Sequence, residues 1–251
     1  MPRFFVRADQ IADGKIRLVG EDAHHIARSL RMAVGEEITV CDMQGNEYRC
    51  RIEVFDEDRA VCASVLTVKP PENEPPCRIR LFQALPKGDK LDTVIQKAVE
   101  CGAAEIVPFE SERCVVRMKP EAEERKTERR RRIAAEAAKQ CGRSLLPTVQ
   151  PTVSFERMLS MAGESDVCLF CYEGDGTRPL GELLRAHPEL REGGRSVSVI
   201  IGSEGGFSIR EAQAAVSAGM HAVGLGKRIL RTETASGFVL SCLSYVTELD
   251  G

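Results

Sequence analysis

The 251-residue sequence contains no tryptophan, and aromatic residues make up only 5% of it. It also has no long apolar run: segments such as 197–202 (VSVIIG) are far shorter than the ~20 residues that span a bilayer. The first residues, MPRFFVRADQ, contain charges and no apolar signal-peptide core. These absences argue against a membrane partner and a secreted protein, so we expect a cytoplasmic location.

Metal-binding patterns are also scarce. The four histidines form no H-x-x-x-H pair, which argues against a zinc site. Of the ten cysteines, only Cys168 and Cys171 form a C-x-x-C, and this lies in a predicted strand. Residues three apart on a strand point to opposite faces, so these thiols are poorly placed to share a metal. We predict no metal site and interpret the cysteines as small apolar residues.

Two familiar phosphate-binding patterns are missing. The sequence has no G-x-x-x-x-G-K-[ST], and GDGTRPLG has Pro179 where a dinucleotide-binding G-x-G-x-x-G would have its third glycine. The net charge is -3, yet residues 113–143 carry 11 Lys and Arg against 5 Glu. Such an uneven distribution of charge suggests a polyanionic partner.

The pattern of elements changes at a proline-rich segment. Residues 1–70 contain short predicted strands at 15–20, 36–42, 47–55 and 60–68 with one helix at 23–32, which is typical of a small antiparallel barrel. Residues 71–76 lie within the proline-rich stretch KPPENEPP, which predicts a stiff linker. We therefore predict one domain over 1–70 and a second over 77–251.

Strands and helices alternate in the second domain. The predicted strands are 78–85, 104–109, 167–172, 197–202 and 221–226, and the predicted helices are 90–101, 121–142, 180–186, 208–218 and 234–247. This alternation indicates an α/β fold with a mainly parallel sheet and helices on both faces.

A glycine-rich loop, GSEGGFS, follows the strand at 197–202. Its glycines permit close approach of the backbone, and Ser208 with Glu211 fits a capping box at the start of a helix. Glu204 would repel a phosphate but suits a ligand with hydroxyls or a cation. S-adenosylmethionine (SAM) offers both, in its ribose and its sulfonium. The alternative is a tight turn in which Glu204 faces water.

A second loop of this kind, LGKRILRTETA, occupies residues 225–235. It also lies between a predicted strand and a predicted helix, which Thr232 or Thr234 could cap. Three cations accompany the turn, Lys227, Arg228 and Arg231. A solvated basic turn is the alternative, but two such loops close together favour a ligand site.

These two stretches resemble the C-terminal signatures of the RsmE-type 16S rRNA (uracil-N3)-methyltransferases of the SPOUT superfamily. Three further blocks resemble the family in the same order along the chain: HHIARSLRM, KLDTVIQKAVECGAAEIVPFESERCVV and AAEAAKQCGRSLLP. One departure is Ser203, where the family's usual loop has proline, and this change frees the backbone φ angle.

The resemblance implies an N-terminal PUA-like β-barrel that binds RNA and a C-terminal SPOUT α/β domain tied in a trefoil knot. It further implies a homodimer, with SAM bound between three loops of the knot. By position, the cofactor-binding residues would be Cys171, Tyr172, Glu173 and Gly174; Ile201, Gly202, Ser203, Glu204, Gly205 and Gly206; and Leu225, Gly226, Arg228, Ile229, Leu230, Arg231, Thr232 and Glu233.

The reaction that the resemblance implies is methylation of N3 of a specific uridine in the decoding region of 16S rRNA in the 30S subunit. Arg231 is our preferred catalytic residue, because a guanidinium could stabilise the uracil anion. Glu204 or Glu233 could instead act as a base. The alternative for Arg231 is a structural clamp on Glu233 or on the partner subunit.

For RNA binding we favour Arg28 and Arg31, three residues apart on the predicted short helix, with His25 beside them. Secondary candidates in blocks that match the family are Arg7, Lys87, Lys97, Arg113 and Arg143. The run ERKTERRRR is ambiguous, because its charges also fit a salt-bridged helix face. We expect no DNA partner.

Two other functions stay open. A ribose 2'-O-methyltransferase on rRNA or tRNA would have the same fold, but the LRTETA block argues against it. A non-catalytic RNA-binding assembly factor would not need both glycine loops intact.

Overall fold

The structure is a computed structural model that describes residues 1–56 and 59–250. The chain forms two compact units. The first consists of Met1–Glu74 and Ala138–Leu146, and the second of Pro75–Ala137 and Pro147–Gly251. The return of residues 138–146 to the first unit was not part of the sequence-based prediction, which treated each domain as one continuous segment.

The first unit is built on a six-stranded sheet in the order β1-β4-β5-β6-β3-β2. Its strands are β1 (Arg3–Phe5), β2 (Ile11–Ala12), β3 (Lys15–Leu18), β4 (Glu37–Cys41), β5 (Glu47–Phe55) and β6 (Val61–Lys69). Alternate residues of these strands, such as Ile16 and Leu18, are fully buried and form the core of the unit. The β domain is therefore confirmed, although β1 pairs with β4 in parallel and the sheet is not purely antiparallel.

The helix expected at 23–32 is shorter and starts earlier. The α-helix α1 spans Gly20–His24, and a single π-helical turn follows it over His25–Ser29. A separate 3-10 turn lies earlier in the chain, at Ala8–Gln10. Arg31 has a positive φ of 53°, a left-handed conformation that ends the helical path.

The second unit contains an eight-stranded sheet in the order β10-β8-β7-β13-β11-β14-β12, with β9 also paired to β8. All strand pairs in its described part are parallel, as the alternating pattern predicts. The strands are β7 (Arg78–Ala84), β8 (Ala103–Glu110), β9 (Thr148–Val149), β10 (Val153–Ser154), β11 (Val167–Cys171), β12 (Arg178–Pro179), β13 (Ser196–Ile201) and β14 (His221–Gly224).

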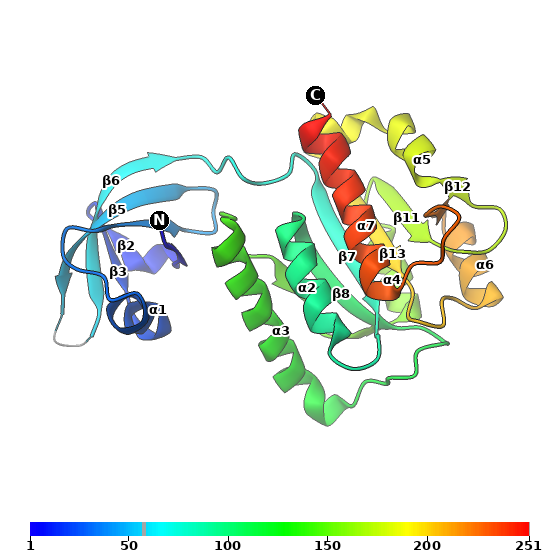
Figure 1. Ribbon diagram of the computed structural model, residues 1–251, viewed down its shortest axis with the longest axis horizontal. Coiled ribbons are helices and arrows are strands. Elements are labelled where there is room, and N and C mark those ends of the chain that lie inside the picture. Colours follow the sequence, from blue (N-terminus) through cyan, green and yellow to red (C-terminus); the bar gives the residue numbers. More distant parts are fainter. Residues whose placement is uncertain (57–58, 251) are drawn as a thin grey trace. The chain divides into compact units, whose positions relative to one another are not determined.

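Helices cover both faces of this sheet (Figure 1). They are α2 (Lys90–Glu100), α3 (Pro120–Cys141), α4 (Phe155–Ala162), α5 (Leu180–Ala186), α6 (Ile209–Ser217) and α7 (Thr232–Ser244), with short turns at Pro188–Arg191 and Tyr245–Leu249. Strand β7 shows the two faces: Arg80 donates to the carbonyl of Met161 in α4, whereas Gln83 contacts Thr232 in α7. Residues 80 and 83 differ by an odd number and so point to opposite faces.

Several elements were not predicted. Helix α4 and the short strands β1, β2, β9, β10 and β12 lack a pattern strong enough to identify them. Helix α4 has a clear local start, because the Ser154 hydroxyl accepts a hydrogen bond from the Arg157 N–H. The last helix begins two residues earlier than expected and ends at Ser244. No helix in the described part of the chain is both long and apolar enough to cross a membrane.

A buried ion pair holds residues 143–145 within the first unit. Glu74 Oε2 accepts hydrogen bonds from Arg143 Nη2 at 2.6 Å and Nε at 3.1 Å. Its other oxygen accepts the backbone N–H groups of Ser144 and Leu145 at 2.8 and 3.0 Å. Since Arg143 is only 4% exposed, Glu74 compensates a charge that water cannot reach.

We therefore expect Glu74→Ala to destabilise the first unit by about 3 to 5 kcal/mol, because the buried Arg143 guanidinium would lose its ion pair with Glu74. Denaturant unfolding, followed by amide hydrogen exchange at residues 143–145, measures this. Glu72→Ala is the matched control, since Glu72 forms an exposed pair with Lys69 that should contribute less than about 1 kcal/mol. Equal effects of the two substitutions would contradict the role of Glu74.

Candidate active site

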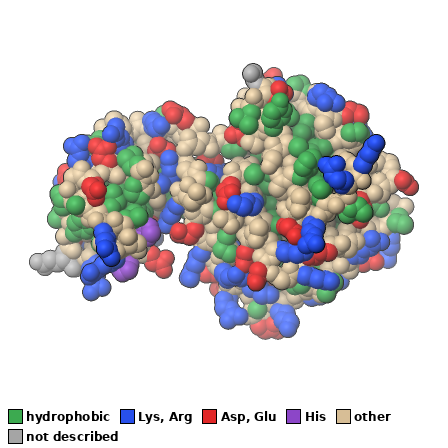
Figure 2. All heavy atoms as spheres, viewed as in Figure 1, with side chains coloured by type: hydrophobic (Ala, Val, Ile, Leu, Met, Phe, Trp, Pro, Cys, Tyr) green, Lys and Arg blue, Asp and Glu red, His purple; other side chains and the backbone are tan. Residues whose placement is uncertain are grey.

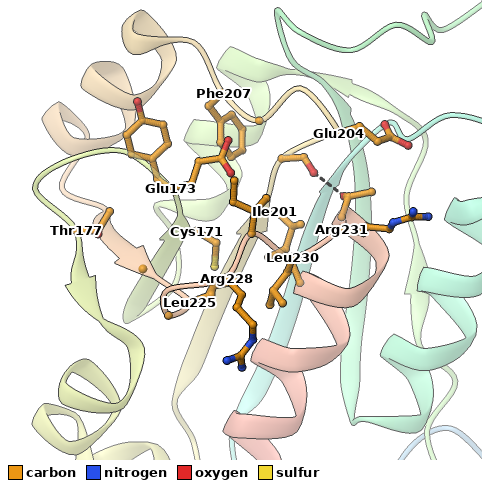
Figure 3. Close-up of a pocket in the computed structure, with 18 of the residues that line it drawn as sticks. Cys171, Glu173, Thr177, Ile201, Glu204, Phe207, Leu225, Arg228, Leu230 and Arg231 are labelled. Atoms are coloured by element: carbon orange, nitrogen blue, oxygen red, sulfur yellow. Dashed lines mark hydrogen bonds between the residues drawn. The ribbon is translucent and has the colours of Figure 1, made fainter.

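A cavity of about 540 Å³ lies in the second unit, at one edge of its sheet. Strands β13, β11 and β14 are neighbours and run in parallel, so their carboxyl ends meet at this edge. The segment that follows each strand contributes residues to the cavity wall (Figure 3). These are Tyr172, Glu173 and Thr177 after β11, residues of the GSEGG loop after β13, and residues 225–232 after β14. The three loops named from the sequence are therefore brought together.

Most of the residues predicted for cofactor binding line the cavity, with three exceptions: Gly174, Gly205 and Glu233. Gly205 belongs to the glycine loop but is not among the lining residues. A Cβ added there would lie 3.0 Å from Arg113 Cβ and 3.2 Å from its carbonyl oxygen, so that side of the glycine faces Arg113 and not the cavity. The lining residues that sequence reasoning missed are Thr177, Phe207, Gly224, Lys227 and Ala235.

The GSEGG loop is a tight turn between β13 and α6. The Gly206 N–H donates to the Ser203 carbonyl at 2.9 Å, and Gly206 has a positive φ of 64° that favours glycine. Phe207 is buried, with its ring centroid 4.3 Å from that of Phe170 in β11. The capping box predicted for α6 is confirmed: Ser208 and Glu211 each accept the other's backbone N–H.

The carboxylate in this loop does not occupy a phosphate position. Glu204 Oε1 accepts the Lys87 backbone N–H at 3.1 Å and pairs with Lys90 Nζ at 2.8 Å. Burial acts to raise the pKa of Glu204, but hydrogen bonds from Lys90 and from the backbone of Glu204 and Lys87 outweigh it, so its pKa lies below the ordinary value. Glu204 thus fastens the glycine loop to the segment between β7 and α2.

A second link joins the glycine loop to α7. The Thr232 hydroxyl donates to the Gly202 carbonyl at 2.6 Å and accepts a hydrogen bond from Gln83 Nε2 at 2.8 Å. Thr232 was proposed as a capping residue, but Arg231 holds the N-cap position of α7 and its side chain makes no capping bond. The Thr232 hydroxyl instead ties two cavity loops together.

Arg231 is exposed at the start of α7. Its guanidinium forms no ion pair with any residue in 1–56 or 59–250. Glu233, the partner considered for a structural clamp, lies 3.5 Å from Lys90 Nζ instead. The geometry therefore leaves Arg231 available for a ligand, and Lys90, which the sequence analysis did not single out, pairs with both candidate bases.

The favoured RNA-binding residues are exposed but arranged differently from the prediction. Arg28 lies in the π-helical turn, whereas Arg31 lies beyond its end, so the expectation of one shared helix face is wrong. His25 is exposed and its ring meets Phe4 edge-on at 6.3 Å. In the smaller unit, Figure 2 shows histidine side chains beside Lys or Arg side chains.

The secondary RNA candidates differ in their surroundings. Arg143 is corrected, because its guanidinium is buried against Glu74 and does not face solvent. Arg7 pairs with Asp9, and Lys97 pairs with Glu100, both on the surface. Arg113 Nη1 donates to the Gly205 carbonyl at 3.0 Å, and Lys87 contributes its backbone N–H to Glu204.

The basic run in α3 is largely paired within its own unit. Arg130 is buried and contacts Glu123 at 3.3 Å, Arg132 contacts Glu128 at 3.7 Å, and Arg129 pairs with Asp92 in α2. On the face shown in Figure 2, basic and acidic side chains are interspersed over the larger unit. The interpretation as a salt-bridged helix face is therefore supported for these arginines.

The cavity fits a cofactor with both apolar and polar parts. Its wall combines buried apolar side chains such as Ile201 with the carboxylate of Glu173, and its volume lies in the range of small-molecule sites. A Cβ on Gly206 would lie 3.0 Å from Glu173 Oε1, so a larger residue at this position would displace the Glu173 carboxylate, and the positive φ of 64° also favours glycine. Cys171 is buried in the wall, and burial raises its pKa to about 12, which makes it an inert thiol.

Comparison with known proteins agrees with this geometry. A family model described as "RNA methyltransferase domain" matches residues 73–244, and one described as "RNA methyltransferase PUA domain" matches residues 18–63. The chain is 34% identical to ribosomal RNA small subunit methyltransferase E of Bacillus subtilis (strain 168), covering 99% of this chain and 98% of the relative. It is 32% identical to the protein of that name from Aquifex aeolicus (strain VF5), covering 89% and 91%.

A solved structure is similarly close. Ribosomal RNA small subunit methyltransferase E from Neisseria gonorrhoeae, bound to S-adenosyl methionine, has a TM-score of 0.84 and 31% identity, with 98% of each chain covered. Fold, cavity and family models together define an RNA methyltransferase domain joined to a PUA domain. More particularly, the chain belongs to the ribosomal RNA small subunit methyltransferase E family.

The packing at Gly206 generates a prediction. Gly206→Ala should weaken SAM binding by about tenfold, or ~1.4 kcal/mol, because the new methyl group displaces Glu173 in the cavity wall. Isothermal titration calorimetry with SAM measures this. Gly219→Ala is the control: Gly219 also has a positive φ, of 85°, but a Cβ there meets nothing within 4 Å. It should cost about 1 kcal/mol of stability and no SAM affinity; equal SAM affinity in both variants would contradict the assignment of the cavity.

Proposed function

We propose that this protein uses SAM to methylate N3 of a specific uridine in the decoding region of 16S rRNA in the 30S subunit. The observation that carries the proposal is Arg231, which lines a cavity built from three strand-end loops and whose guanidinium forms no ion pair among residues 1–56 and 59–250. Family membership supports the enzyme class, since relatives over the full length of the chain are ribosomal RNA small subunit methyltransferases.

The cavity is where SAM would bind, and the solved structure of the relative from Neisseria gonorrhoeae has S-adenosyl methionine bound. Backbone groups of the glycine loop and of residues 225–230 would enclose it, and Glu173 offers a carboxylate to a hydroxyl or a cationic group. When bound, SAM supplies a methyl group on a sulfonium, which N3 of uracil takes as the thioether leaves.

Arg231 has the central role in this reaction. Uracil N3 carries a proton, and its loss places negative charge on the ring and on O2 and O4. A guanidinium near these oxygens stabilises that charge, in the manner of an oxyanion hole. The proton leaves to solvent, and the Arg231 guanidinium acts only as a hydrogen-bond donor to the ring oxygens.

Glu204 and Glu233 are weaker candidates for a base. Lys90 pairs with both carboxylates, and the pKa of Glu204 is below its ordinary value. An efficient base at neutral pH needs a pKa closer to 7, so pairing with Lys90 works against this role. These contacts favour Arg231 as the principal catalytic residue, with Glu204 positioning the loop.

The first unit would hold the RNA through Arg28, Arg31 and His25, with Arg7 as a secondary contact. Lys87, Lys97 and Arg113, which belong to the second unit, would be further secondary contacts. N3 lies on the Watson–Crick edge, so the target uridine must be unpaired or turned out of its helix during methylation. Unpaired RNA is also the form in which proteins most readily read bases.

The proposal includes the domain limits and the assembly. We assign 1–70 to RNA binding, 71–76 to the linker and 77–251 to methyl transfer, except for residues 138–146, which belong to the first unit. We further propose a trefoil knot in the C-terminal part. The proposal includes a homodimer and a cytoplasmic location. The homodimer is supported by apolar side chains left exposed on and after α7: Phe238 is 42% exposed, Tyr245 55% and Leu249 72%.

Arg231→Ala tests the catalytic role. Single-turnover methylation of 30S subunits should slow by about 100- to 1000-fold, because the variant lacks the group that stabilises the uracil anion. SAM and RNA affinities should be retained. Raising the pH should restore part of the rate, since N3 then ionises without help, and the wild-type rate should rise less. A defect that is equal at every pH and accompanied by loss of SAM binding would instead indicate a structural clamp.

RNA binding by the first unit is tested with Arg28→Ala combined with Arg31→Ala. The double variant should bind 30S subunits more weakly, and the salt dependence of binding should become shallower because fewer phosphates are neutralised. Its SAM affinity should match that of the wild-type protein. Filter binding across a salt series measures the RNA affinity and its dependence on salt. Unchanged RNA affinity in the double variant would place the binding surface elsewhere.

A further inference from the structure

Lys90 is the first residue of α2 and does not line the cavity. A cation at the start of a helix is locally unfavourable, because the helix dipole is positive there. Lys90 is nevertheless well fixed: its Nζ lies 2.8 Å from Glu204 Oε1 and 3.5 Å from Glu233 Oε2. These contacts compensate the unfavourable position and indicate a role beyond helix formation.

The two carboxylates belong to different cavity loops. Glu204 lies in the loop after β13, and Glu233 lies in the first turn of α7, two residues after Arg231. Glu233 Oε2 is buried and has no hydrogen-bond partner among the described residues, so Lys90 is the cation that balances it. In Figure 3, the side chains of Glu204 and Arg231 extend to the same side of the view.

Removal of Lys90 would leave two negative charges without a cation. Arg231 is the basic residue nearest to Glu233 in the sequence, and it has no ion pair of its own among the described residues. A guanidinium forms bidentate, charge-assisted hydrogen bonds with carboxylates readily. A carboxylate bound to Arg231 would neutralise it and occupy the donors that a uracil oxygen needs.

We infer that Lys90 is a positioning residue that holds Glu204 and Glu233 together and so keeps the Arg231 guanidinium free for the substrate. This inference rests on the catalytic role proposed for Arg231. It also explains why two separate segments at the cavity, the glycine loop and the first turn of α7, each place a glutamate near a catalytic cation. The Thr232 hydroxyl, which links the same two loops at Gly202, fixes the backbone, while Lys90 sets the charges.

The test is a set of single-turnover methylation rates on 30S subunits at saturating SAM and RNA. Lys90→Met should slow the rate about tenfold or more, which corresponds to ~1.4 kcal/mol, with SAM and RNA affinities within about twofold of wild type. Lys90→Arg should retain most of the rate, because it preserves the charge. Arg195→Met is the matched control, since it removes the ion pair with Asp166 on a part of the unit that does not line the cavity.

The decisive comparison uses Glu233→Gln as a second background. If Lys90 acts by restraining the carboxylates, Lys90→Met should cost much less rate in this background than in the wild-type protein. Lys90→Gln, a polar substitution, serves in the same comparison if the methionine variant has a lower melting temperature. An equal cost in both backgrounds overturns the inference, as does a Lys90 variant that loses only RNA affinity, which would make Lys90 an RNA contact.

The catalytic role of Arg231 and the positioning role of Lys90 can be told apart by these variants. If Arg231→Ala keeps the wild-type rate, the proposed catalytic role fails and the inference fails with it. If Arg231→Ala is slow but Lys90→Met costs the same with and without Glu233, the catalytic role stands and only the inference is overturned.

Discussion

The side-by-side pairing of three parallel strands determines where the active site forms. Strand β11 lies between β13 and β14, and the hydrogen bonds between them hold three carboxyl ends at one edge of the sheet. Two of the loops that leave this edge are joined by a partly buried hydrogen bond from the Thr232 hydroxyl to the Gly202 carbonyl. Gln83, which reaches Thr232 from β7, adds a third segment to the same junction. The cavity depends on this arrangement more than on any single lining residue.

Charge is distributed around that junction in a specific way. Two glutamates that would otherwise compete for Arg231 both lie next to Lys90, and the guanidinium is left without an ion pair among the described residues. A negative residue in a glycine loop therefore does not exclude an anionic substrate, because its charge is turned toward the α2 segment. The same contact fastens the loop and lowers the pKa of Glu204, which suits a structural anion better than a base.

Local patterns predicted a large part of the fold. The bounds of α5 were predicted correctly, and the Ser208 capping box located the start of α6, because both depend on neighbouring residues. Contacts between distant residues could not be predicted in this way. Lys90 and Glu204 are 114 residues apart in sequence, and nothing in either segment indicates the pairing. The burial of Arg143 against Glu74 could not be predicted either, since this contact requires residues 138–146 to belong to the first unit. The orientation of Gly205 toward Arg113 also depends on packing that periodicity does not encode.

The position of the new methyl group tests most directly whether this protein methylates N3 of a uridine in 16S rRNA. Purified protein, SAM carrying an isotopically labelled methyl group and 30S subunits from a strain that lacks this enzyme would be combined, and the 16S rRNA digested to nucleosides for mass spectrometry. The account predicts label in N3-methyluridine, at a single position of the RNA. Label on a ribose 2'-oxygen, or binding of the RNA without any methyl transfer, would contradict it.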